Sequence, residues 1–502
     1  MKKMMLLTGV LAFLLFSCDG DLTGTGGNGG NTDPPETKTF KALNWKTNEF
    51  YTLSAELLAE GTHCKIWVEK GSGVTKEIAE KVKNEYDSNV YTKMINTFGA
   101  NNEGFSFADE LADINSAEGG KLIILLLNIK DNYQKDVDEN AVGGYFLWSD
   151  LFPAEDGSNG LAMIYIDTNP GVPGEAASNK TLAHEMQHLM NEVTSQVLRY
   201  NDATESYAAM DTWIDEGLSA AAEWVYSGTH SSDRVNWYNY KNTDSKIKSL
   251  INDGNNFFVW GNRKEESGYA EQDDYATTYL FFQWLRIQSS KGTGIYKDII
   301  GSNNSGYSAV TAAFGDNWGN LLRDWLAANY INDTSASGTN SRYGYKNDAT
   351  LKNITKHYFA GTDDTKTTPL YPGEGVFSNI DAGYVAANTN KPTDTTNIKY
   401  TILTNAPGNT MAVGALLTYN VNTSNIDDSD PDDIKFPTWE NGTVTGGTAS
   451  ISVDVSVDGR FVSPPVILSG PFWVSGGDVL RRNGRVNLSP AGVPRPLIRV
   501  SR

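Results

Sequence analysis

Two histidines four residues apart, His184 and His188, most constrain the fold, because their pairing requires an α-helix. Positions i and i+4 of a helix lie one above the other on the same face. Two imidazoles in that arrangement can hold two corners of a tetrahedral zinc site. Glu185 lies one step further round the helix, where its carboxylate can deprotonate a zinc-bound water. The segment predicts a helix that faces a catalytic metal.

The flanking residues fit a helix that Asn179 or Thr181 caps at its N-terminus. Apolar residues supply its packing: Leu182, Ala183, Met186, Leu189 and Met190. One alternative is a pair of semi-buried histidines satisfied by protein groups, and another is chance. The chain has only 5 histidines, so chance gives the motif only about a few times per thousand such chains. A metal site is therefore the favoured interpretation.

A catalytic zinc site needs a third protein ligand and one open position for water. The residues after His188 lack the glycine and the third histidine of the metzincin pattern, so that class is excluded. The best candidate is Glu216, near the start of a second helix whose small residues permit close packing. Residues 194–212, between the two helices, can form a loop. A helix-start carboxylate or a surface ion pair is the alternative for Glu216.

His-Glu-x-x-His followed by the Trp213–Leu218 segment (WIDEGL) resembles the gluzincin metallopeptidases. Within that group the chain is most similar to the hyicolysin family of bacterial secreted neutral proteases. The similarity is specific over residues 143–331, weaker over 39–142 and absent from the C-terminal region. It implies a zincin-like catalytic domain in which His184, His188 and Glu216 bind zinc. It also implies that Glu185 is the general base and acid.

The resemblance further implies a tyrosine that donates to the oxyanion, downstream of the second helix. Tyr275 is the first candidate, and Tyr279 and His230 are alternatives. The chain departs from thermolysin-like relatives at Ala220, where those enzymes carry an aspartate that orients a histidine ligand. That task needs another carboxylate, and the candidates are Asp211, Asp215 and Glu223.

The N-terminus predicts export. Lys2 and Lys3 precede an apolar run that is too short to span a bilayer, and the run ends in a lipoprotein-like box, Leu15-Phe16-Ser17-Cys18. We expect residues 1–18 to be a lipoprotein signal, with Cys18 lipidated, and residues 19–38 to be a flexible tether. An ordinary secretory signal is the alternative. The predicted location is the bacterial cell envelope or surface, through an N-terminal lipid anchor.

Composition limits the partners and the metal chemistry. The net charge of −20 argues against nucleic acid and anionic lipid surfaces as partners. Besides Cys18 the only cysteine is Cys64, which excludes a thiolate zinc site. The acidic segment 427–433 offers carboxylates for calcium, although a solvated acidic turn is the alternative. No oligomeric state is predicted.

Hydrophobic periodicity changes twice along the chain. Residues 39–178 predict strands with a helix over 75–98, and residues 179–358 predict helices, including 275–288 and 318–331. Mixed sheet followed by helices is an α+β layout. The strand expected at 162–167 either lines a cleft edge or is an ordinary sheet strand. Residues 359–502 show short alternating segments that predict a C-terminal all-β module.

Together these features predict a zinc metalloendopeptidase that hydrolyses peptide bonds in proteins outside the cytoplasm. One alternative is an inactive surface lipoprotein that binds a host or glycan ligand. The motif carboxylate Glu185 argues against it, because a structural zinc has no use for that acid. A zinc aminopeptidase is the other alternative, but the chain has no Gly-x-Met-Glu-Asn motif for the substrate amine.

Overall fold

The computed structural model describes residues 34–102, 104–135, 141–239, 270–332, 342–346 and 348–354, with short strands between 368 and 445. Cys18 and the acidic segment 427–433 lie outside the described residues, so lipidation and calcium binding stay predictions. The first strand begins at Thr37, which corrects the expected end of the tether at residue 38.

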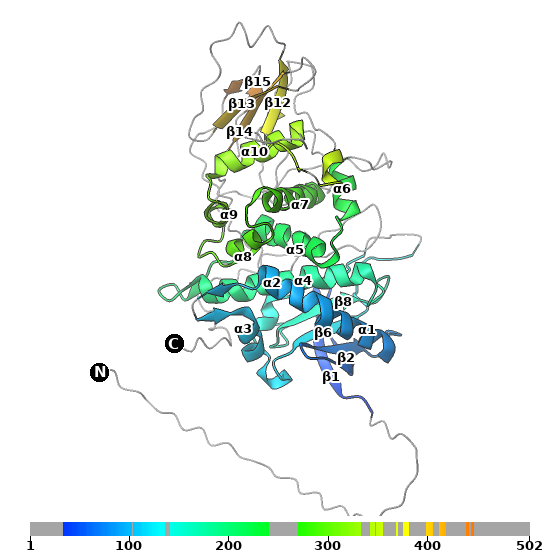
Figure 1. Ribbon diagram of the computed structural model, residues 1–502. Coiled ribbons are helices and arrows are strands. Elements are labelled where there is room, and N and C mark those ends of the chain that lie inside the picture. The colour runs from blue at the N-terminus through cyan, green and yellow to red at the C-terminus, as the bar shows by residue number, and fades with distance from the viewer. Residues whose placement is uncertain are drawn as a thin grey trace, which may run out of the picture. The chain divides into compact units, whose positions relative to one another are not determined.

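A mixed six-stranded sheet forms the first part of the fold (Figure 1). Its order is β1 (Thr37–Asn44), β2 (Glu49–Glu60), β3 (Cys64–Glu69), β6 (Leu122–Leu127), β8 (Met163–Asp167) and β7 (Gly144–Tyr145). The central strands β3, β6 and β8 are parallel, and the remaining neighbours are antiparallel. Two further short pairs of strands join β4 (Asn101–Asn102) to β5 (Phe105–Ser106) and β9 (Tyr200–Asn201) to β10 (Ser206–Tyr207).

The β8 strand lies inside the sheet, so of its two alternatives the ordinary sheet strand is the one observed. β6 pairs with one side of it, and β7 pairs with the other through Gly144 opposite Ile166 and Tyr145 opposite Tyr165. The strand next to the motif helix is therefore an ordinary sheet strand, and β7 is the edge. A two-residue strand carries no alternation that a sequence pattern can detect.

Alternate residues of the central strands enter two separate cores, as the period of two along a strand requires. Ile66, Ile124 and Ile164 point to the face that the helices cover. Trp67 and Leu125 point to the opposite face, where they pack with residues of β1 and of the loop before β8. All six residues of β6 are buried, which explains the unbroken apolar run in its sequence.

Helices follow the sheet, which confirms the α+β class. Over residues 76–98 a helix forms as predicted, in three segments: α1 (Lys76–Glu85), a π-helical turn (Tyr86–Val90) and α2 (Tyr91–Phe98). Further along the chain lie α3 (Phe107–Ile114), α4 (Ala176–Leu198), α5 (Thr212–Ser227), α6 (Ser232–Tyr238), α7 (Ala270–Gln288), α8 (Gly294–Ile300), α9 (Tyr307–Phe314) and α10 (Trp318–Ile331). Helix α4 packs against β8 on one side and α5 on the other, and α5 packs against α7 (Figure 1).

The C-terminal strands pair in two small antiparallel sheets. β14 (Met411–Leu417) lies between β12 (Gly375–Ile380) and β13 (Ile398–Thr404), and β15 (Thr438–Glu440) lies between β11 (Thr368–Pro369) and β16 (Thr443–Thr445). Among the alternating segments that predict this module, 384–387 and 451–457 lie outside the described residues. The all-β module therefore remains a prediction.

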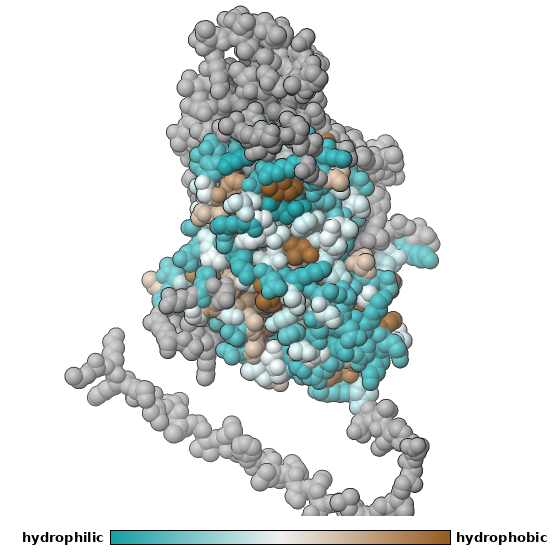
Figure 2. Space-filling view, viewed as in Figure 1, coloured by the Kyte–Doolittle hydropathy of each residue, from teal (hydrophilic) through white to brown (hydrophobic). Residues whose placement is uncertain are grey.

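The described surface is mostly polar on the face shown in Figure 2, where hydrophobic residues lie apart from one another. Among the described residues, no helix has the length and hydropathy to cross a bilayer. Cys64 is fully buried, and burial raises the pKa of its thiol far above the usual range. Burial therefore disfavours a catalytic thiolate at this position.

Candidate metal centre

Helix α4 presents the motif from a fully buried position. His184 and Glu185 are 0% exposed and His188 is 2% exposed. The helix begins at Ala176 after Glu175, about one turn before the expected caps. Asn179 and Thr181 lie inside it, where Asn179 donates a hydrogen bond to the Gly174 carbonyl, so the expected caps are wrong. Packing against the sheet extends the helix beyond what cap signals alone indicate.

The C-terminal end of α4 also differs from expectation. The helix continues to Leu198, so the first residues of the expected loop 194–212 are helical. Arg199 fixes this end because its buried guanidinium donates to the carbonyls of Ala208 and Ile300, each at 3.0 Å. The chain then returns through the β9–β10 hairpin to α5. The spacing between His188 and Glu216 is thus filled by ordered structure.

Helix α5 brings Glu216 against the motif helix, and Gly217 permits the close packing behind it. A β-carbon at residue 217 would lie 2.3 Å from the ring of Phe282 and 2.7 Å from Oγ1 of Thr278. The Thr278 hydroxyl donates to the Trp213 carbonyl at 2.8 Å, which joins α7 to α5 at the same level. The glycine in the Glu-Gly-Leu segment therefore lets α7 press against the back of the helix that holds Glu216.

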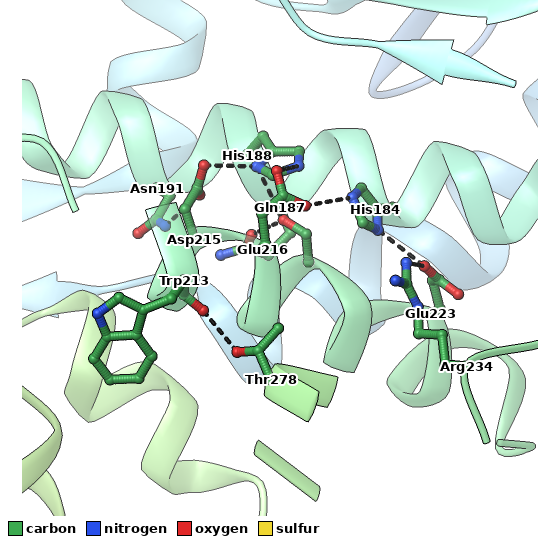
Figure 3. Close-up of polar contacts among 11 residues, drawn as sticks. His184, Gln187, His188, Asn191, Trp213, Asp215, Glu216, Glu223, Arg234 and Thr278 are labelled. Carbon is green, nitrogen blue, oxygen red and sulfur yellow. Dashed lines mark hydrogen bonds and ion pairs between the residues drawn. The ribbon is translucent and has the colours of Figure 1, made fainter. Parts of the chain in front are cut away.

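His184, His188 and Glu216 form a compact donor set, as predicted. One ligand atom from each residue lies within 4.8 Å of the others. Nε2 of His184 is 3.5 Å from Oε2 of Glu216, and Nε2 of His188 is 3.6 Å from Oε1 (Figure 3). These separations exceed a hydrogen bond. They are close to the ~3.4 Å between two ligands of a tetrahedral ion with bonds of ~2.0–2.1 Å.

The same atoms identify the place of the cation. His184 Nε2, His188 Nε2 and both Glu216 carboxylate oxygens are buried without a hydrogen-bond partner among the described residues. Buried polar atoms are almost always satisfied. Two imidazole nitrogens and a carboxylate oxygen are the ligand set of a catalytic zinc site with an open position. The residues therefore fit a zinc ion.

Each histidine is oriented by a carboxylate from the same helix that supplies Glu216. Nδ1 of His184 lies 2.9 Å from Oε1 of Glu223, and Nδ1 of His188 lies 2.8 Å from Oδ2 of Asp215. An ionised carboxylate only accepts hydrogen bonds, so both Nδ1 atoms carry a proton, and the tautomer in which Nε2 carries the lone pair is the one left for a metal that replaces the Nε2 proton. That tautomer is the one a metal requires.

Two of the three carboxylate candidates therefore take the orienting role, and Asp211 does not. Asp211 precedes α5, and its carboxylate accepts from the indole nitrogen of Trp213 at 3.3 Å. Ser219, which sequence reasoning missed, places its hydroxyl 3.1 Å from Nδ1 of His188. Asn191, also missed, donates its side-chain amide to Asp215. Both lie one turn from a motif residue on the facing sides of α4 and α5.

The electrostatics of the centre are dominated by its carboxylates. Burial lowers the pKa of His188, but Asp215, Glu216 and Glu185 outweigh burial and raise it to about 10. Burial also lowers the pKa of His184, but Glu216 and Glu223 outweigh burial, so this pKa too is raised. A site this rich in negative charge attracts a cation. The effect of Glu185 on His188 also places its carboxylate within electrostatic range of the donor set.

The candidates for the oxyanion donor separate into two groups. The Tyr279 hydroxyl forms a 2.6 Å hydrogen bond with Nδ1 of His230. Nε2 of the same ring lies 2.8 Å from Asp348. These contacts tie Asp348 through His230 to Tyr279 on α7. Tyr275 lies one turn earlier on α7, is 5% exposed, and has the guanidinium of Arg234 5.0 Å from its ring centroid. Arg234 in turn contacts Glu223, the carboxylate partner of His184.

A His-His-Glu donor set on two packed helices beside a mixed sheet is consistent with a gluzincin. No protein-family model matches the chain. The chain is, however, similar to the neutral metalloprotease ShpI of Staphylococcus hyicus, with 28% identity over 276 residues. The match covers 54% of this chain and 56% of that protein, so it spans about half of the relative's length. The predicted resemblance to neutral metalloproteases is confirmed over that half.

Proposed function

We propose that this protein is a zinc-dependent metalloendopeptidase that hydrolyses peptide bonds in proteins outside the cytoplasm. The observation that carries the proposal is the buried donor set of His184, His188 and Glu216, with Glu185 on the same helix. Similarity to a protein named as a neutral metalloprotease supports the same reaction class. Both oriented histidines present Nε2 to one point, as a metal hydrolase needs.

The proposed reaction divides between the bound ion and the protein. Zinc supplies a water whose pKa falls towards about 7 and a Lewis acid for the scissile carbonyl. Glu185 accepts the proton of the attacking water and returns it to the leaving amine. Burial of Glu185 keeps this carboxylate away from bulk solvent, so the proton passes between the reacting groups. His184, His188 and Glu216 would hold the ion.

Tyr275 is the proposed donor to the developing oxyanion. Its rival Tyr279 is engaged with His230 and also accepts from the Ser231 amide at 3.3 Å. Tyr275 instead packs beside Arg234, which contacts the carboxylate partner of His184. His230 is the least suitable of the three candidates, because both of its ring nitrogens already contact protein groups.

Export and anchoring through Cys18 are proposed from the N-terminal sequence alone. A lipid on Cys18 and a flexible tether place the reaction at the bacterial envelope or cell surface. Substrates are then proteins or peptides that reach that surface. The acidic charge of the chain disfavours nucleic acid as a partner.

Metal removal tests the proposed function. The full chain, purified with its metal, should contain about one zinc per chain and cut casein into internal fragments. Dialysis against a chelator should abolish cleavage, and stoichiometric zinc should restore it while calcium alone should not. Zinc binding without any cleavage would favour a surface binding protein. Release of single N-terminal amino acids without internal fragments would favour an aminopeptidase.

A further inference from the structure

Arg234 is a buried cation whose role the proposed reaction leaves open. It lies on α6, is 2% exposed, and its Nη2 donates to Oε1 of Glu223 at 2.7 Å. The same Oε1 atom accepts from Nδ1 of His184 at 2.9 Å. A continuous chain of contacts therefore runs from Arg234 through Glu223 to the imidazole that faces Glu216, as Figure 3 shows.

We propose that Arg234 is a positioning residue of the metal centre, which acts by holding Glu223 in the one orientation that aligns His184. The inference rests on the proposed metal site and goes beyond it, because Arg234 is not itself a ligand of that site and acts through Glu223. A buried carboxylate is costly to keep ionised without a cation or strong donors nearby. Arg234 supplies that cation, and its donor also fixes which oxygen meets the imidazole.

The other histidine shows why the arginine has a specific task. Asp215, which orients His188, accepts from the neutral side-chain amide of Asn191 and is partly accessible, with 27% of its side chain exposed. Glu223 has 8% of its side chain exposed and contacts an arginine instead. Water can solvate Asp215 in part, whereas Glu223 depends on the protein. The arginine accordingly serves the more buried of the two carboxylates.

Arg234 is itself held from two sides. Its edge meets Glu223 on α5, and its guanidinium lies 5.0 Å from the centroid of the Tyr275 ring on α7. Helix α6 is tied to α7 by Trp237, whose indole nitrogen donates to Asp273 at 2.6 Å. A planar guanidinium suits this place because its face stacks on a ring while its edge donates to a carboxylate. Lysine offers no such plane.

Helix α5 carries both Glu223 and the metal-site carboxylate Glu216. Glu223 follows Glu216 by seven residues, which is two helical turns, so both side chains lie on the same face of α5. Glu216 contacts both histidines from that face, and Glu223 reaches the far nitrogen of one of them. Movement of Glu223 therefore changes the direction of the His184 lone pair without displacing Glu216.

Zinc affinity, measured by competition with a chromogenic chelator, tests the proposal. Arg234→Met should weaken zinc binding about 10- to 100-fold, the effect typical of losing an outer partner. The matched control is Arg286→Met, because Arg286 has 12% of its side chain exposed, stacks 3.5 Å from the centroid of Trp224 and pairs with Asp348 rather than Glu223. That control should lose stability but keep the zinc affinity of the wild type. Equal zinc affinities in Arg234→Met and Arg286→Met would overturn the proposal.

A double-mutant cycle distinguishes positioning through Glu223 from any other effect. Glu223→Gln should weaken zinc binding, and adding Arg234→Met to it should change the affinity by less than about 3-fold. An undiminished effect of Arg234→Met in the Glu223→Gln background would contradict the proposed route. Should Arg234→Met fail to fold, Arg234→Lys beside Arg286→Lys gives the same comparison. A several-fold loss of zinc affinity is then expected for Arg234→Lys and not for Arg286→Lys. Equal zinc affinities in these two variants would overturn the proposal.

The outcome is separable from that of the proposed function. A wild-type chain that binds zinc but cleaves no protein would contradict the peptidase reaction and leave the Arg234 comparison intact, since affinity is its readout. A wild-type chain without zinc affinity would overturn both. Cleavage by Arg234→Met at saturating zinc, with weakened affinity, would support a positioning role and separate it from catalysis.

Discussion

Replacing Glu185 by glutamine should leave the protein with its zinc and almost without activity. Glutamine has nearly the same shape, so the buried packing of α4 is preserved, and neither histidine ligand is changed. An amide cannot accept the proton of the attacking water, and loss of a general base costs about 10²- to 10⁴-fold in rate. Zinc content by atomic absorption and the initial rate of casein cleavage together check this expectation.

Glu192→Gln is the matched control for this substitution. Glu192 lies further along the same helix and accepts hydrogen bonds from Gln196 and Tyr207, outside the donor set. The same chemical change there should leave zinc content and cleavage close to those of the wild type. Cleavage by Glu185→Gln within about 10-fold of the wild type would rule out Glu185 as the proton acceptor.

The second large effect is expected at Glu216. Glu216→Gln should reduce zinc affinity by more than the roughly 10- to 100-fold loss that follows removal of an outer partner, because a direct ligand is lost. His184 and His188 alone then hold the ion, which is one ligand fewer than catalytic zinc sites have. Casein cleavage at limiting zinc should fall with the affinity. Chelator competition on the purified variant measures the change.

Asp150→Asn is the control for Glu216→Gln, because it neutralises a buried carboxylate elsewhere. Burial raises the pKa of Asp150 to about 7, against hydrogen bonds from Tyr165 and Asn159. A neutral amide is therefore tolerated at Asp150 near neutral pH, and zinc affinity should not change. If Glu216→Gln keeps wild-type affinity, the third ligand is another residue.

The sequence was sufficient to predict the centre itself but not its supporting contacts. The i, i+4 spacing of His184 and His188 depends only on helix geometry, and Glu216 belongs to a motif on one helix. Which carboxylate meets which histidine depends on how α4 and α5 are packed. Asp215 and Glu223 were predicted as candidates without an assignment, and Asp211 was predicted beside them although it contacts Trp213 instead.

Other features depend on contacts between residues far apart in the chain. Arg234 lies on a short helix with no motif around it, and its partner Glu223 became evident only from the structure. The start of α4 was misplaced because Asn179 resembles a cap, whereas packing against β8 extends the helix to Ala176. The edge strand Gly144–Tyr145 is too short to show a period. In each case tertiary packing overrides the local pattern.

The most direct test of the central claim is diffraction from crystals of the zinc-loaded protein, recorded on both sides of the zinc absorption edge. The account predicts one anomalous peak between His184, His188 and Glu216, with ligand distances of about 2.0–2.2 Å. A strong peak elsewhere with no density at this place, or no peak from protein that binds zinc in solution, would contradict it.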